Sequence, residues 1–107
     1  MHIHELQDLD YEDALNLLET ELENLKLRIG ETEEKLNGAD EQTRRDHEAE
    51  LAELHARRRE AEQALARMRE MKAEEYAGEK DNLLTEMLGL FDQIGERIDR
   101  LVSALTG

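Results

Sequence analysis

Apolar residues in the first third of the chain recur at alternating intervals of four and three positions. This spacing is that of the a and d positions of a coiled coil, and six of the eight residues on it are aliphatic. Acidic residues surround its start, where they complement the dipole of a helix N-terminus. We therefore predict a helix from about residue 10 to residue 36, with this stripe as its seam: Tyr11, Leu15, Leu18, Leu22, Leu25, Ile29, Thr32 and Leu36.

A turn is predicted directly after this helix. Asn37 and Gly38 suit the left-handed cap at a helix C-terminus, and Asp40 suits the N-cap of a second helix, expected over about residues 41–76. Because the link has only three or four residues, we expect the two helices to be antiparallel neighbours.

The register of this hairpin is predicted from its heptads. Folding about residues 37–40 places a residues of one helix opposite d residues of the other in every layer. The flanking positions then bring Lys26 to Glu48 and leave Glu33 facing Glu41. Exposed charge pairs contribute only ~0.2–1 kcal/mol each, so they select a register more than they stabilise it. The predicted layers are Ile29–His47, Leu25–Leu51, Leu22–Leu54, Leu18–Arg58, Leu15–Ala61 and Tyr11–Leu65, flanked by Glu21–Arg57 and Arg28–Glu50.

Three basic residues fall on a positions of the predicted second helix: Arg44, Arg58 and Lys72. A polar ligand is one interpretation of basic groups on a seam. We favour packing of their aliphatic stems, with the charged ends reaching carboxylates such as Glu19 or Glu21.

A second, weaker break is predicted near Gly78. One glycine costs a helix only about 1 kcal/mol, but Lys72 and Leu84 are twelve residues apart where an unbroken heptad needs fourteen. The later stripe therefore faces about a third of a turn away. Either the chain bends near Gly78 and a third helix, about residues 82–104, folds back, or the helix stays straight and its last face dimerises. We favour the bend.

The third helix carries the widest apolar stripe of the chain, which needs more than one helical neighbour. The predicted fold is all-α: a single domain, residues 1–107, with an antiparallel coiled-coil hairpin and a third amphipathic helix in a three-helix or dimeric bundle. Because a chain of this size has little else to cover the stripe, we expect it to serve self-association or partner binding. Its seam residues are Leu84, Met87, Phe91, Ile94, Ile98, Leu101 and Leu105.

Composition agrees with long helices and limits the function. Charged residues make up 39% of the chain, aromatic residues 3%, and there is no proline, which is typical of helices with solvated faces. The net charge of −14 opposes binding to nucleic acid or anionic membranes and suits a basic protein partner. The longest apolar run, residues 87–91, is far too short to span a membrane. No basic and apolar leader is visible at the N-terminus, so we expect a cytoplasmic protein.

Candidate catalytic and metal motifs fail on spacing. His47 and Glu48 resemble the start of a zinc-protease motif, but position 51 is leucine where a second histidine is required. A di-iron bundle needs a glutamate three residues before a histidine, and Arg44 and Ala52 occupy those positions. A terminal metal-binding arm at His2-Ile3-His4-Glu5 is less favoured than a frayed end. We predict no catalytic, cofactor-binding or metal-binding residues.

Two functions of different kinds are favoured. The first is a non-enzymatic coiled-coil structural or interaction protein that self-associates, as a dimer, and binds an unidentified protein partner through its third helix. The alternative is an acidic binding chaperone or inhibitor of a basic client, similar to a secretion chaperone or a nucleic-acid mimic. Salt separates the two, because capture by charge weakens as ionic strength rises and apolar packing does not. A small enzyme or metal protein is the third and least favoured hypothesis.

Overall fold

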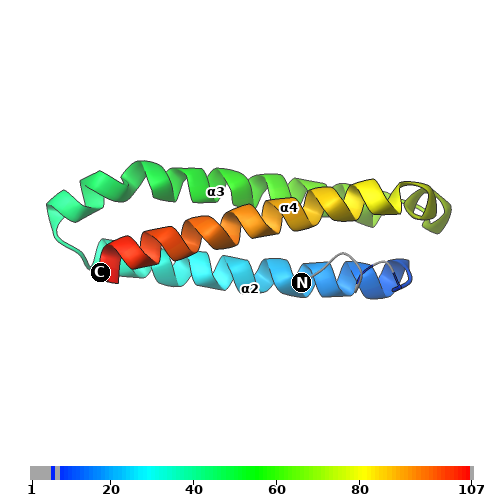
Figure 1. Cartoon of the computed structure of the whole chain (residues 1–107), viewed down its shortest axis with the longest axis horizontal. Coiled ribbons are helices and arrows are strands. Elements are labelled where there is room, and N and C mark those ends of the chain that lie inside the picture. The colour runs from blue at the N-terminus through cyan, green and yellow to red at the C-terminus, as the bar shows by residue number, and fades with distance from the viewer. Residues whose placement is uncertain (1–5, 7, 107) are drawn as a thin grey trace.

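Three long helices make up nearly all of the computed structural model, which describes residue 6 and residues 8–106. Helix α2 spans Tyr11–Asn37, α3 spans Glu41–Glu70 and α4 spans Ala73–Thr106. Each helix packs against the other two in an elongated bundle of 52 × 22 × 18 Å (Figure 1). None of the described residues forms a strand. The predicted all-α fold is therefore confirmed.

The N-termini of α2 and α3 follow the sequence closely. The Asp10 side chain accepts a hydrogen bond from the Asp13 amide at 2.9 Å, and Asp40 accepts one from the Thr43 amide at 2.7 Å. Each carboxylate thereby satisfies an amide that its helix leaves without a partner. Gly38 differs from the prediction, since its φ of −83° is right-handed. Its amide instead donates to the Glu34 carbonyl at 3.1 Å, which extends the last turn of α2.

Helices α2 and α3 are antiparallel, but the predicted register is wrong. Lys26 Nζ lies 3.8 Å from Glu62, where Glu48 was expected. Glu33 lies 3.4 Å from His55 Nε2, where Glu41 was expected. Both observed partners stand fourteen residues farther along α3 than predicted.

The register error has a simple physical cause. Registers displaced by whole heptads still place a positions opposite d positions, so the heptad pattern by itself does not distinguish between them. The predicted register folds the chain tightly about residues 37–40. Instead the first turn of α3 projects past the end of α2 (Figure 1), and Glu41, Gln42, Arg44 and Arg45 are exposed there.

The second break also lies earlier than predicted. Helix α3 ends at Glu70, and Met71 is extended with ψ of 146°. Helix α4 then runs without interruption through Gly78. The reason is Tyr76, which is only 4% exposed and packs edge-on against Tyr11 with ring centroids 5.2 Å apart. Burying Tyr76 together with the apolar stripe of α4 requires the residues around Gly78 to be helical.

One continuous core joins the three helices. Thr32 is the one buried polar residue among those described, and its hydroxyl donates to the Arg28 carbonyl at 2.8 Å. Arg58 lies half-buried on the seam as predicted, but it pairs with Glu62 of its own helix at 2.7 Å. Arg44 and Lys72 are exposed. The core residues of α2 and α3 are Ala14, Leu18, Leu22, Leu25, Ile29, Leu54, Ala61, Ala64, Leu65 and Met68.

Candidate functional site

The predicted interaction residues of α4 lie inside the bundle. All but the last are 0–5% exposed, and Leu105 is half-buried. Helices α2 and α3 of the same chain cover them, so a partner cannot reach them in this arrangement. Their role in self-association or partner binding stays a prediction, and it requires α4 to leave the bundle. The residues concerned are Leu84, Met87, Phe91, Ile94, Ile98, Leu101 and Leu105.

The outer surface offers little apolar area in their place. Leu27, on the outside of α2, is 66% exposed and is the one large apolar side chain exposed among the described residues. Single exposed leucines are ordinary on soluble proteins. A binding site on the closed bundle must therefore use polar or charged groups.

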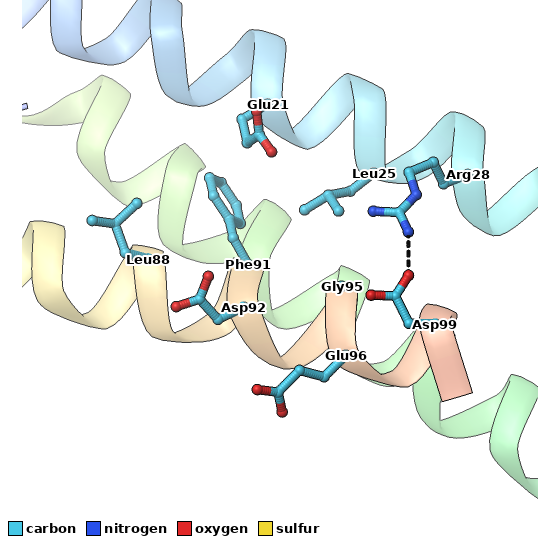
Figure 2. A pocket seen from close by; sticks show the side chains of 9 residues that line it. All are labelled: Glu21, Leu25, Arg28, Leu88, Phe91, Asp92, Gly95, Glu96 and Asp99. Atoms are coloured by element: carbon cyan, nitrogen blue, oxygen red, sulfur yellow. Dashed lines mark hydrogen bonds and ion pairs between the residues drawn. The ribbon is translucent and has the colours of Figure 1, made fainter. Parts of the chain in front are cut away.

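A groove between α2 and α4 combines an apolar floor with acidic walls. Its volume is about 290 Å³. Figure 2 shows Glu21 of α2 and Asp92 of α4 on opposite sides of the Phe91 ring. Gly95 widens the groove, since a Cβ added there meets nothing within 4 Å. The other lining residues are Leu25, Arg28, Leu88, Glu96 and Asp99.

One ion pair closes an end of this groove. Arg28 Nη2 lies 2.7 Å from Asp99 Oδ1, and the two side chains are 45% and 73% exposed (Figure 2). An exposed pair of this kind contributes ~0–1 kcal/mol, so it guides the parallel alignment of α2 and α4 more than it stabilises it. No ion pair joins Glu21, Asp92 or Glu96 to another described residue. These three carboxylates therefore lack an ion-pair partner within the described chain, and Arg28 is the one basic residue among those that line the groove.

The face between α3 and α4 has the opposite character, because bases and acids alternate there. Arg97 lies 3.7 Å from Glu50 and 3.8 Å from Glu53. Arg57 lies 2.9 Å from Glu53 and 3.0 Å from Glu60. The hydrogen bond and charge of Glu60, with the charge of Glu53, raise the pKa of the Arg57 guanidinium above its ordinary value. The acids of this face are thus paired with arginines, whereas Glu21, Asp92 and Glu96 of the α2–α4 groove have no such partner in the part of the chain that the structure describes.

His55 is held by structural contacts. His55 Nε2 lies 3.4 Å from Glu33, and its Nδ1 accepts a hydrogen bond from Arg58 Nε at 3.4 Å. His47 lines a small hollow beside Arg100. Across residues 6 and 8–106, no three histidine, aspartate or glutamate side chains gather as a metal site requires. The predicted arm of His2, His4 and Glu5 lies outside the described residues.

Comparison with protein-family models, with curated proteins and with solved structures finds no match for this chain. Within the described residues, no helix combines the length and apolar character needed to cross a membrane.

Sequence reasoning missed this groove, although a signal for it exists. Asp92, Glu96 and Asp99 recur at intervals of four and three residues, parallel to the apolar seam of α4. An acidic stripe beside a seam marks the edge of a helix interface. Its partner, Glu21, could not be assigned because the sequence does not give the offset between α2 and α4.

Proposed function

We propose that this chain is a non-enzymatic interaction protein that binds a basic segment of a partner protein along the groove between α2 and α4. The observation that carries the proposal is a set of three carboxylates without an ion-pair partner among the described residues, Glu21, Asp92 and Glu96, around an apolar floor in a chain of net charge −14. Of the two functions predicted from the sequence, this is the alternative, an acidic protein that binds a basic client. A cytoplasmic location stays a prediction.

The chemistry of the groove suits lysine and arginine. Their aliphatic stems pack on apolar surface while their charged ends reach nearby carboxylates. Here the stem lies over Leu25, Leu88 and Phe91, which are 4%, 9% and 5% exposed. Such a floor leaves little apolar area to bury, so the carboxylates supply most of the affinity. Exposed pairs contribute ~0.2–1 kcal/mol each, which implies a weak complex that is sensitive to salt.

Binding through the apolar face of α4 is less favoured for the closed bundle. That mode needs the buried stripe of α4 to separate from α2 and α3 before a partner can pack on it. Opening exposes the buried side chains of α4, at ~1.5–3 kcal/mol for each large one. The groove needs no such opening.

The proposal is tested with a labelled amphipathic peptide rich in lysine and leucine, whose binding is followed by fluorescence anisotropy. We expect binding that weakens at least about tenfold between 50 and 300 mM salt. The double substitution Asp92→Lys with Glu96→Lys should remove most of the remaining affinity. The matched control, Glu34→Lys with Glu48→Lys, makes the same change of charge on exposed residues away from the groove.

Comparison of the two double variants distinguishes a defined binding site from a response to total charge. A loss confined to the groove variant supports a defined site. An equal loss in both variants means that the peptide responds only to total charge, and the groove then has no special role.

A further inference from the structure

The two links of the bundle are encoded differently in the sequence. The first contains Asn37 and Gly38, and its Asp40 caps α3. The second, Met71 and Lys72, has no residue whose side chain can cap a helix N-terminus, because a lysine side chain only donates hydrogen bonds. At the start of α4, the Lys72 carbonyl accepts a hydrogen bond from the Tyr76 amide at 3.0 Å, which is an ordinary main-chain bond of a first helical turn.

The sequence around the second link favours helix throughout. Residues 67–75 read Arg-Met-Arg-Glu-Met-Lys-Ala-Glu-Glu, with no glycine, proline, serine, threonine, asparagine or aspartate. Arginine, methionine, glutamate, lysine and alanine, which make up this segment, are all among the strongest helix formers. The extended conformation of Met71 is therefore imposed by tertiary packing, since it allows α4 to bury its stripe against its own chain.

We infer that two copies of this chain can form a dimer by exchanging α4, so that packing between the copies replaces the packing of α4 within each chain. When Met71 and Lys72 become helical, α3 and α4 join into one helix over residues 41–106. The freed α4 then fills the position that the α4 of the other copy has left. Every contact between α2 and α4, including the pair of Arg28 with Asp99, re-forms between copies. Exchange of identical elements is a route to dimers that builds no new interface.

The geometry of the bundle permits this exchange. The second link lies at one end of the molecule (Figure 1). Two bundles can therefore lie end to end, with two joined helices of about 100 Å running antiparallel through both. The change of phase between the stripes of α3 and α4 is no obstacle, because the joined helix packs on two different bundles.

Concentration decides between the closed chain and the exchanged dimer. A short link keeps α4 near its own bundle at an effective concentration on the order of millimolar. The closed monomer therefore dominates in dilute solution. The dimer forms when concentrated protein is warmed, so that α4 detaches, and is then cooled.

The test uses a pair of engineered cysteines, because the chain has none of its own. Arg28→Cys on α2 with Asp99→Cys on α4 puts the two thiols at facing positions of the bundle. A sample annealed at about 1 mM is separated by size exclusion with light scattering, and each peak is treated with a short thiol-specific cross-linker. On a denaturing gel, the monomer peak should give single chains and the dimer peak should give linked pairs. A dimer peak that denatures to single chains would mean side-by-side packing and would overturn the inference, as would the absence of any dimer.

Two proline variants test whether the link before α4 must become helical for the dimer to form. Ala73→Pro puts proline at the first position of α4, where its missing N–H is not needed in the closed chain. In the joined helix the same proline is internal, so we expect the association constant to fall at least about a hundredfold. The control, Glu41→Pro, places proline at the first position of α3 and should leave dimerisation unchanged. A dimer insensitive to Ala73→Pro, or sensitive to Glu41→Pro instead, overturns exchange of α4.

Discussion

The hydroxyl of Tyr11, at the start of α2, donates a hydrogen bond to the main-chain carbonyl of Met68 in the last turn of α3. The Met71 amide reaches the same carbonyl at 3.1 Å. In an unbroken helix, the amide of Lys72 would occupy that carbonyl. Tyr11 therefore stabilises the end of α3 at the point where the chain turns back.

Replacement of Tyr11 by phenylalanine tests this contact. The ring still packs on Tyr76, while the hydrogen bond to Met68 is lost. We expect the free energy of unfolding to fall by about 0.5–1.5 kcal/mol and the exchanged dimer to become more abundant. Urea titration followed by circular dichroism measures the first effect, and light scattering measures the second. Unchanged stability would show that water satisfies the carbonyl equally well.

Gly78 should be replaceable with a gain in stability. It lies inside α4 with no positive φ, and a Cβ added there meets nothing within 4 Å. Alanine removes the entropic cost of glycine in a helix, so Gly78→Ala should stabilise the chain by about 0.5–1 kcal/mol. Gly30→Ala, at an equally open position of α2, is the matched comparison. A loss of stability at Gly78 alone would restore the bend that the sequence suggested there.

Asp40 should give part of the stability a dependence on acid pH. Hydrogen bonds from Thr43 lower the pKa of the Asp40 carboxyl below its ordinary value of 3.8. A carboxyl whose pKa is lowered in the folded state stabilises the protein above its unfolded pKa, and this contribution is lost as the pH falls through the folded pKa. Asp40→Asn keeps a capping oxygen that does not titrate. The Tm advantage of the natural chain over this variant should shrink between pH 5 and pH 2, as measured by thermal melts.

The closed arrangement makes opposite predictions for two large apolar residues. Ile94 is 0% exposed and Leu27 is 66% exposed. Ile94→Ala should cost about 2–5 kcal/mol through lost burial and the cavity left behind, whereas Leu27→Ala should change stability by less than about 0.5 kcal/mol. Denaturant titration of both variants provides the comparison. A small effect at Ile94 would mean that the stripe of α4 is not packed inside the chain.

Local signals predicted the elements well. The heptad spacing from Tyr11 to Leu36 gave the first helix within one residue at each end, and Asp40 gave the start of the next. Both depend on neighbouring residues alone. The register could not be predicted in this way, because shifts by whole heptads leave the pattern unchanged.

The position of the second break was predicted wrongly for a related reason. Gly78 has the lowest helix propensity of the residues near the change of phase. The structure instead places the break at two strong helix formers, because burial of Tyr76 outweighs local preference. Because α4 packs back on its own chain, its apolar stripe, which was expected to face a partner, forms part of the core. The same packing places α4 beside α2 and forms the groove between them.

The return of α4 onto its own chain is the central claim, and a distance between two spin labels tests it most directly. Labels at Leu27→Cys on α2 and Arg100→Cys on α4 are introduced into the chain, which is then diluted into an excess of unlabelled protein. The closed bundle predicts a distance close to its cross-section of 22 × 18 Å, plus the reach of the labels. A distance of roughly 60 Å or more, as a straight α3–α4 helix would give, would contradict it.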